Sequence, residues 1–345
     1  MDNLVNALVR EIKQRSTTEK IGSIYFGGGT PSLLKESHWI DLINSINENF
    51  SNQDIDEFTI EVNPEDINQD NLETWKKIGI NRLSIGVQSL QDSELLWMNR
   101  IHSSKQAIKS IELAQNIGFN NISIDLIFGG PLKSDEQWKN DLNWAFEQNI
   151  QHISAYALTV EPKTRLEHEI KQGKSPELQD IKMVSQFNIL QTEMINRGWD
   201  VYEISNYCLP SFNAVHNSRY WEGLPYIGIG PGAHSFNGKN LRRWNIANNA
   251  RYIQFSENGS SFWENEELTP NNIINEYIMT ALRTSKGINI EKIISLDSSW
   301  ISINKASIQY FKNQGLILSN NNLIQLSTEG KLLANHIISE LMIVD

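Results

Sequence analysis

Short apolar runs recur along the first two-thirds of the chain, each followed by a turn and a helical pattern. In order they are residues 21–26, 57–62, 82–87, 121–128, 152–160 and, less regular, 199–205. Amphipathic stretches separate them, and one carries Ala107, Ile111 and Ala114 on a single face. Alternating helices and apolar strands predict a parallel sheet covered by helices, and five or six such units fit a complete or partial barrel best.

The first helix departs from this repeat. Its apolar face carries Leu4, Val5, Leu8, Val9 and Ile12, a stripe suited to covering a sheet. No strand comes before it, although a helix of this kind normally follows one in a repeating βα architecture. We therefore expect a barrel that starts one strand late.

The pattern changes after residue 205. Residues 1–205 predict the βα barrel, whereas residues 206–265 are rich in Gly, Pro, Asn and aromatic residues and predict an ordered, loop-rich segment that closes the pocket. Residues 266–345 follow the order helix, hairpin, helix, which predicts a small winged-helix-like α+β domain. Winged helices often bind DNA, but the acidic balance of the chain favours a packing or partner role.

The composition limits which partners the protein can have and in which cellular compartment we expect it. Thirty basic and 41 acidic residues give a net charge of −11, which argues against a nucleic acid as the main partner. No segment has the unbroken apolar length of a membrane span, and acidic and polar residues interrupt the first helix, which is therefore not a signal peptide. We expect a cytoplasmic protein, and the sequence leaves open whether it forms a homodimer.

Polar or glycine-rich residues follow the ends of five predicted strands. They are GGGTP at 27–31, EVNP at 61–64, Gln88-Ser89, Asp125 ahead of GGP at 129–131, and Glu161-Pro162. Since ligands bind at the carboxyl ends of barrel strands, the five motifs predict one continuous pocket. Each alone has a structural alternative, because three glycines can form a turn and Glu61 or Asp125 can be a helix N-cap or a buried acid.

These motifs resemble those of the radical S-adenosylmethionine (SAM) family. They are GGGTPSLL, EVNPE, GINRLSIGVQSLQD, MNRIH and SIDLIFGGP, and the likeness continues through SAYALTVEPKT, HNSRYW and GIGPGAHSF. Within the family the sequence is similar to the branch that holds oxygen-independent coproporphyrinogen III oxidase and the HemW-type haem chaperones, and the HNSRYW block looks more like the chaperones. The resemblance implies an α/β fold, a partial (β/α)6 TIM-like radical SAM barrel that is N-terminally incomplete, with a winged-helix-like C-terminal domain.

The resemblance also implies a SAM site. In the family the glycine-rich loop lies against the methionine end of SAM, where a missing Cβ lets the backbone approach the ligand. Carried over position by position, the SAM-contacting residues are Gly28, Gly29, Thr30, Glu61, Gln88, Arg100 and Asp125. Carboxylates accept from ammonium or ribose hydroxyl groups, and Arg100 can pair with a carboxylate, although an exposed surface role is its alternative.

A haem chaperone further requires a haem site. Iron ligation needs a neutral imidazole or another donor, and His216 in HNSRYW and His234 in GPGAHSF lie in the loop-rich segment. The expected flanking residues are Tyr220, Trp221 and Tyr226 for the porphyrin faces and Arg242 or Arg243 for the propionates. The structural alternative is that His216 and Tyr220 only hydrogen-bond the loop backbone.

The family places a CxxxCxxC motif ahead of the GGGTP loop, and its three thiolates hold a [4Fe–4S] cluster. This sequence has one cysteine, Cys208, which supplies at most one thiolate and excludes an internal disulfide framework. We expect a chain truncated at its N-terminus rather than a lineage that discarded its cluster, and no cluster on the polypeptide as written. Whether the chain is an enzyme is left open.

The sequence thus favours a HemW-like protein that binds SAM and haem and delivers haem to acceptor proteins. The alternative enzyme is an oxygen-independent coproporphyrinogen III dehydrogenase of porphyrin biosynthesis, which uses SAM radicals to decarboxylate two propionates. A third hypothesis, outside the family, is a barrel enzyme that binds phosphate with the GGGTP loop. It is weakened because the loop carries no lysine and no strand end shows an acid–base histidine.

Overall fold

The chain divides into two compact units. The computed structural model describes residues 1–51 and 55–344. The first unit contains Met1–Ile24, Leu34–Glu57 and Ala214–Asp345, and the second contains Tyr25–Leu33 and Phe58–Asn213. Among the described residues, no helix is both long enough and apolar enough to cross a membrane.

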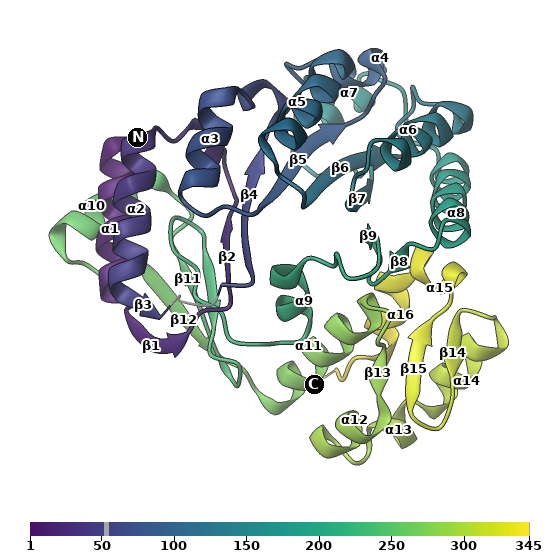
Figure 1. The fold of residues 1–345 in the computed structure, drawn as a ribbon. Helices are drawn as coiled ribbons and strands as arrows, with labels where there is room; N and C mark the ends of the chain where they lie inside the picture. Colours follow the sequence, from purple (N-terminus) through teal and green to yellow (C-terminus); the bar gives the residue numbers. More distant parts are fainter. Residues whose placement is uncertain (52–54, 345) are drawn as a thin grey trace. The chain divides into compact units, whose positions relative to one another are not determined.

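The second unit is built around a seven-stranded sheet with strand order β2-β4-β5-β6-β7-β9-β8 (Figure 1). The strands are β2 (Ser23–Phe26), β4 (Glu57–Val62), β5 (Arg82–Gln88), β6 (Ile122–Phe128), β7 (His152–Ala157), β8 (Asp200–Val201) and β9 (Asn206–Cys208). Strands β4 to β7 pair in parallel, and β9 pairs antiparallel with both β7 and β8. The predicted α/β partial barrel is confirmed.

The structure corrects two predicted strands. The run at 152–160 ends as a strand at Ala157. The expected sixth strand at 199–205 is instead the short β8, which turns back into the antiparallel β9. The Glu203 carboxylate accepts a hydrogen bond from the Ser205 amide at 3.0 Å, a contact two residues along the chain that stabilises the turn. A two-stranded parallel sheet of β1 (Thr17–Lys20) and β3 (Phe50–Ser51) was not predicted.

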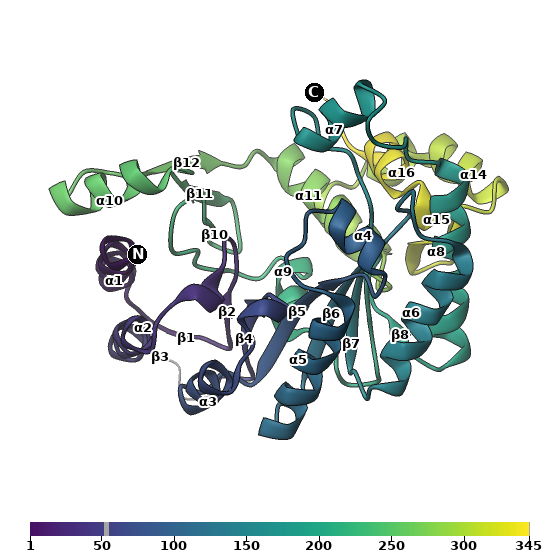
Figure 2. The same cartoon turned by 90° about the horizontal axis from the view of Figure 1, so that it is seen from above.

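Helices cover the outer side of the curved sheet of the second unit (Figure 2). Those on the outer side are α3 (Gln69–Lys77), α5 (Ser104–Ile117), α6 (Asp135–Glu147) and α8 (Asp180–Asn196), whereas the shorter helices α4 (Asp92–Trp97) and α7 (Arg165–Lys171) come after β5 and β7 in the chain. The side chains of Asn68, Ser103 and Ser134 cap α3, α5 and α6 by accepting from backbone amides of the first turn. Alternate strand residues point outward and are buried, including Ile60, Leu83, Ile85, Ile124 and Ile153. Each such side chain contributes roughly 1.5–3 kcal/mol by leaving water.

The first unit has two parts of its own. One contains α1 (Asp2–Gln14), α2 (Glu36–Asn49), α9 (Val215–Trp221), α10 (Asn249–Asn258) and the antiparallel strands β10 (His234–Phe236), β11 (Leu241–Asn245) and β12 (Trp263–Glu267). The C-terminal part contains α11 (Pro270–Arg283), α12 (Ile290–Leu296), α13 (Trp300–Ile303), α14 (Lys305–Asn313), α15 (Thr328–Leu332) and α16 (Ala334–Leu341). These helices accompany the sheet β13-β15-β14 (Ile288–Asn289, Leu323–Leu326, Ile317–Ser319).

Helix α1 differs from the sheet-covering helix that its sequence predicts. It packs against the helices α2 and α10. Leu4 and Leu8 pack against a cluster of Ala7, Tyr252 and Phe262. The helix also buries a carboxylate completely, which an apolar stripe does not predict.

That carboxylate belongs to Glu11, and polar groups surround it. It accepts hydrogen bonds from the Tyr252 hydroxyl (2.6 Å), the Gly230 amide (2.8 Å) and the Asn245 side-chain amide (2.8 Å). The Arg15 guanidinium lies 3.8 Å away. A buried charge is tolerated only when it is paired and hydrogen-bonded, and Glu11 meets both conditions.

We predict that Glu11→Ala lowers the free energy of unfolding by about 3 kcal/mol or more, because it leaves buried donors and Arg15 without their acceptor. Urea denaturation followed by circular dichroism measures the loss. The matched control is Glu19→Gln, since Glu19 is exposed and its substitution should change the midpoint little. Equal midpoints for Glu11→Ala and the wild type would contradict this role of Glu11.

Candidate functional site

The inner face of the parallel strands is polar along its length. Register places Thr59 beside Arg82, Glu61 beside Ser84, and Asp125 beside Ser154. The inward residues of the four strands are Thr59, Glu61, Arg82, Ser84, Ser123, Asp125, His152 and Ser154. An apolar core would not be lined in this way, so this face is suited to a polar ligand.

The glycine loop follows β2 and faces open space. Gly28 and Gly29 have φ angles of +72° and +78°, and a Cβ built on either would meet no atom within 4 Å. The left-handed backbone explains why glycine is needed, because other residues are strained there. Thr30 comes next, and its carbonyl accepts from the Leu33 amide at 3.2 Å. The exposed loop therefore leaves room for a ligand to approach its backbone.

Glu61 ties this loop to β4. Its carboxylate accepts from the Tyr25 hydroxyl at 2.6 Å and from the Gly28 amide at 3.2 Å. A Cβ at Gly27 would lie 2.5 Å from the Tyr25 ring and 2.8 Å from Glu61. Gly27, unlike Gly28 and Gly29, is therefore required by close packing rather than by its backbone conformation. The Gly28 amide thus bonds Glu61, and each carboxylate oxygen retains a further acceptor site.

Asp125 lies at the centre of the inner face on β6. Its carboxylate accepts hydrogen bonds from the hydroxyls of Ser84, at 3.4 Å, and Ser154. Burial raises the pKa of Asp125 to about 6, and the neighbouring Glu61 charge adds to the increase while the two serine hydroxyls oppose it. A carboxyl group that titrates near neutrality beside a second carboxylate favours a cationic ligand.

Gln88 ends β5 in an unusual conformation. Its φ angle is +67°, and the Ser89 amide donates to the Val87 carbonyl at 2.8 Å, so the chain makes a γ-turn centred on Gln88. A Cβ at Gly86 would lie 2.9 Å from Nε2 of Gln88, which shows that this side chain folds back over the inner face. A non-glycine residue held at positive φ is a strained feature that tends to occur at functional sites.

Fewer contacts hold the side chain of Arg100 in place than hold Glu61, Gln88 or Asp125. Its amide donates to the Leu95 carbonyl at 2.8 Å, which closes the C-terminal turn of α4. Its side chain is half-buried, and among the described residues that side chain has no hydrogen bond or ion pair. Thr30 and Arg100 are thus not joined by hydrogen bonds to Glu61, Gln88 or Asp125.

A buried ion-pair network supports the end of β5. Lys133 is fully buried, and its amine lies 3.0 Å from Glu94 and 2.8 Å from Asp141. It also donates to the Ile127 carbonyl at 3.1 Å. Glu94 in turn accepts from the hydroxyl of Ser89, the residue after Gln88, at 2.8 Å. The network joins the ends of β5 and β6 to α4 and α6.

His216 lies in the first unit on helix α9, within the segment predicted as loop-rich. The Glu57 carboxylate accepts from the amides of Val215 (2.7 Å) and His216 (3.2 Å), which caps the helix from a distant part of the chain. Nδ1 of His216 lies 3.1 Å from the Ser23 hydroxyl. Burial lowers the pKa of His216, with Arg219 adding to the effect and Glu57 opposing it. The imidazole is therefore neutral at neutral pH, the form that binds iron.

Aromatic residues continue from α9. Tyr220 lies 5.8 Å from Trp221 and 5.3 Å from Tyr226 between ring centroids. His234 is exposed and stacks on Trp244 at 6.1 Å. The two arginines expected to bind propionates have protein partners, since Arg242 pairs with Glu276 at 2.8 Å and Arg243 lies 3.7 Å over the ring of Trp263. Propionate binding would have to compete with these contacts.

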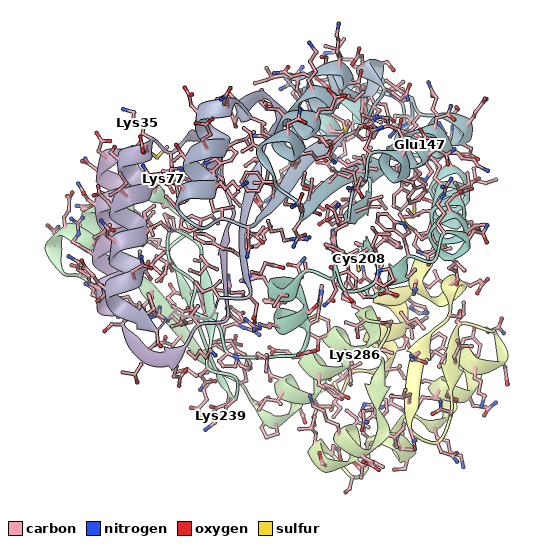
Figure 3. All side chains as sticks on the ribbon, in the orientation of Figure 1. Lys35, Lys77, Glu147, Cys208, Lys239 and Lys286 are labelled. Carbon is pink, nitrogen blue, oxygen red and sulfur yellow. The ribbon has the colours of Figure 1, made fainter. Side chains whose placement is uncertain are left out.

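Cys208 does not provide a cluster ligand. It is fully buried on β9 (Figure 3), and burial beside Asp200 raises the pKa of its thiol to about 12. Within residues 1–51 and 55–344, no three His, Cys, Asp or Glu side chains converge as a metal site.

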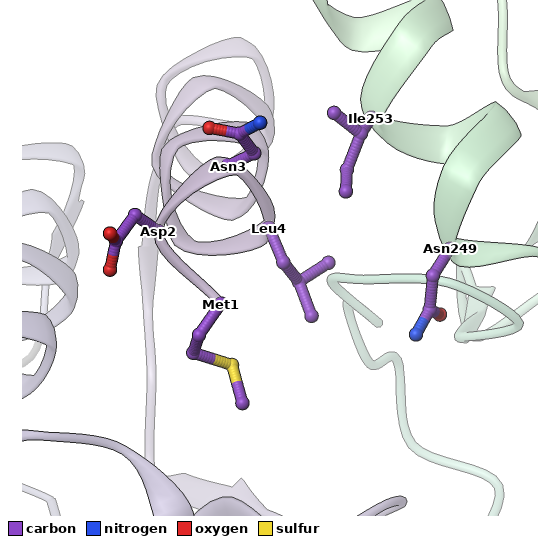
Figure 4. A pocket seen from close by; sticks show the side chains of 6 residues that line it. All are labelled: Met1, Asp2, Asn3, Leu4, Asn249 and Ile253. Atoms are coloured by element: carbon purple, nitrogen blue, oxygen red, sulfur yellow. The ribbon is translucent and has the colours of Figure 1, made fainter.

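A hollow of about 530 Å³ lies in the first unit (Figure 4). Its lining residues come from the start of α1 and from α10, and they are Met1, Asp2, Asn3, Leu4, Asn249 and Ile253. None of them is a predicted site residue. The lining carries one carboxylate side chain and no lysine or arginine side chain, so it offers no evident recognition of SAM or haem.

The polar inner face includes residues that the motifs missed, namely Tyr25, Ser84, Ser123, His152 and Ser154. The sequence does carry a signal for them. In EFTIEV, RLSIGV and ISIDLIF, polar and apolar residues alternate with the period of two that places them on opposite faces. These strands are therefore apolar on one face only.

We predict a pH-dependent effect of Asp125→Asn on stability. The pKa of Asp125 is higher in the folded chain (about 6) than its ordinary value of 3.8, so its stabilising contribution is complete below about pH 3.8 and is lost as the pH rises through about 6. Asp125→Asn should therefore raise the free energy of unfolding by about 2 kcal/mol near pH 8 and much less near pH 4. Thermal denaturation at both pH values measures the difference.

Asp92→Asn is the control, and its expected effect on the free energy of unfolding near pH 8 has the opposite sign. Hydrogen bonds from Ser104 lower the pKa of Asp92, so its contribution is present above the ordinary value and is lost as the pH falls below it. The control should therefore destabilise the chain near pH 8. A stabilisation by Asp125→Asn that is equal at both pH values would contradict the assigned pKa.

Comparisons with known proteins agree with this geometry. Residues 3–145 match the model of the radical SAM superfamily. The heme chaperone HemW of Bacillus subtilis (strain 168) is 33% identical over 352 residues, which cover 98% of this chain and 90% of that protein. HemW of Lactococcus lactis subsp. lactis is 28% identical over 346 residues, covering 100% and 90%.

In structure, the chain is similar to the coproporphyrinogen III oxidase HemN of Escherichia coli, a radical SAM enzyme. The TM-score is 0.83 at 23% sequence identity, covering 99% of this chain and 83% of that chain. At this identity the likeness shows the fold alone, whereas the match to the Bacillus protein extends over nearly the whole of both sequences. The chain belongs to the HemW family of radical SAM proteins.

Proposed function

We propose that the chain is a haem chaperone that binds haem and SAM and delivers haem to acceptor proteins in the cytoplasm. The observation that carries the proposal is His216, whose pKa burial lowers and which lies on the same helix as Tyr220 and Trp221, in a chain whose relatives are named heme chaperones. A neutral imidazole ligates haem iron, and aromatic rings suit the apolar porphyrin faces.

For SAM, we propose a site on the inner face of the second unit. The open backbone of Gly28 and Gly29 would receive the methionine end, and Thr30 and Arg100 would contribute to the same end of the ligand. The carboxylates of Glu61 and Asp125 suit the ammonium and sulfonium charges and the ribose hydroxyls. Gln88, folded over Gly86, adds an amide donor and acceptor.

A [4Fe–4S] cluster supplies the electron that cleaves SAM in the radical SAM family. No step of the proposed role is derived through a cluster. The runner-up function, coproporphyrinogen III dehydrogenase, is supported here only by likeness of fold. The relatives that match over nearly the whole chain are named heme chaperones, which favours the chaperone.

We predict that His216→Ala weakens haem binding by about tenfold, because it removes the proposed iron ligand. Titration of the purified chain with haem, followed by its visible absorption spectrum, measures the affinity and the loss of the imidazole-ligated signature. His234→Ala, tested in parallel, decides whether the exposed His234 is a second ligand. The matched control is His336→Ala, since His336 is exposed on α16. Unchanged affinity and spectrum in His216→Ala would refute ligation by His216.

We predict that Gly28→Ala weakens SAM binding by about tenfold, since a methyl group would fill the open space beside a left-handed backbone. Isothermal titration calorimetry with SAM measures the affinity. Gly173→Ala is the control, because Gly173 has a φ of +68° and equally open surroundings. Both variants should lose about 1 kcal/mol of stability, but only Gly28→Ala should lose SAM affinity. Equal SAM affinity in the two variants would remove this loop from the proposed site.

A further inference from the structure

His102 is a buried histidine that the proposed site does not use directly. Its side chain is 1% exposed, in the loop between α4 and α5. Nε2 lies 3.1 Å from the carbonyl oxygen of Val87, and Nδ1 lies 3.0 Å from a carboxylate oxygen of Glu65. Both ring nitrogens therefore face oxygen atoms of the chain.

These contacts determine how many ring protons are favourable when Glu65 is ionised. A backbone carbonyl only accepts hydrogen bonds, so Nε2 carries a proton and donates to Val87. In a neutral ring Nδ1 would then present a lone pair to the ionised Glu65 carboxylate, and the other tautomer would present a lone pair to the carbonyl. Beside an ionised Glu65, either neutral tautomer therefore leaves one repulsive contact. Both contacts are favourable when the ring is an imidazolium that donates from each nitrogen.

The carbonyl that His102 bonds belongs to the γ-turn. Val87 accepts from the Ser89 amide at 2.8 Å across Gln88, and His102 uses the second acceptor site of the same oxygen. The positive φ of Gln88 persists only if its surroundings stabilise it. Ser89 is held on the other side by Glu94, so both ends of the turn are anchored.

His102 also links two motifs at the strand ends. Glu65 belongs to the short helix η2 (Pro64–Asp66) that follows β4, and Val87 is the penultimate residue of β5. Arg100 precedes His102 by two residues. One ring thus holds the segments that carry Glu61, Gln88 and Arg100.

We propose that His102 is a positioning residue, an imidazolium held between Glu65 and Val87 that fixes the Gln88 turn in the conformation that binds SAM. The inference rests on the SAM site proposed above. A purely structural histidine would stabilise the fold without acting through Gln88, and the two roles differ in measurable ways.

The first test is the ¹⁵N NMR spectrum of the histidine rings in the purified full chain near neutral pH. We expect two protonated ring nitrogens for His102, assigned by their absence in His102→Leu. His152 is the matched internal control, because it is also buried but lies 2.7 Å from two hydroxyls, those of Ser123 and Tyr202, and burial lowers its pKa. It should show one protonated nitrogen. A single protonated nitrogen on His102 would overturn the imidazolium.

The conservative variant Glu65→Gln distinguishes the hydrogen bond between residue 65 and His102 from the negative charge of the Glu65 carboxylate. Its side-chain amide can donate to Nδ1 of a neutral His102 that still donates to Val87, so both hydrogen bonds survive. We expect SAM affinity within about twofold of wild type and loss of the proton on Nδ1. Glu65→Leu leaves Nδ1 without an acceptor and should weaken SAM binding by about tenfold. Equal SAM affinities in these two variants would overturn the role of the Glu65 contact.

The decisive test is a double-mutant cycle read by SAM calorimetry. His102→Leu and Gln88→Ala should each weaken SAM binding by about tenfold, and His102→Leu/Gln88→Ala should bind no more weakly than Gln88→Ala. Additive losses would show that His102 does not act through Gln88. Absence of SAM binding by the wild-type chain would refute the SAM site and this role together, whereas the ring spectrum would still decide the state of His102. Should His102→Leu fail to fold, Glu65→Gln and Glu65→Leu supply the comparison.

Discussion

The register of the parallel strands β4 to β7 is the constraint on which the candidate site depends. Side chains alternate between the two faces of a strand, so a fixed register aligns every second residue of neighbouring strands. Glu61 therefore lies beside Ser84, and Asp125 beside Ser154. A shift of one residue would turn these polar groups toward the helices and bring Ile60 and Ile124 inward. The apolar face thus selects the register, and the register assembles the polar face.

Burying so many polar groups on one face is unfavourable unless each finds a partner. The structure meets this condition by pairing neighbours across strands, such as Ser123 with His152 and Tyr25 with Glu61. Asp125 is bonded by two serine hydroxyls, and its pKa is nevertheless raised by burial. A ligand that brings positive charge would stabilise the ionised form of Asp125. Ligand binding at the inner face and the ionisation of Asp125 are therefore coupled.

The sequence predicts much of the fold, because strand–turn–helix periodicity is local. Strands 57–62 and 82–87 follow from it. The antiparallel hairpin β8/β9 was missed, since a side-chain contact of Glu203 directs it. Helix α9 was missed because Glu57, far away in sequence, caps it. Contacts between distant residues have no signature in a single sequence.

For the site, the motifs identified residues at strand ends but not those along the strands. Gln88 was identified by its place at a strand end and by the resemblance, whereas its γ-turn depends on contacts with other segments, among them those of His102 and Glu94. Serine is common at surfaces, so its residue type alone does not mark the serines of the inner face. The alternation of polar and apolar residues along these strands is the signal that the sequence carries for them.

The complete burial of Lys133 has a practical consequence. Amine-reactive reagents modify lysines that reach solvent, and this amine is enclosed by Glu94, Asp141 and the Ile127 carbonyl. Its labelling therefore requires the segment between β6 and α6 to open, and the labelling rate reports the free energy of that opening. Mass spectrometry of a single peptide would thus follow, in the intact chain, how ligands tighten the ends of β5 and β6.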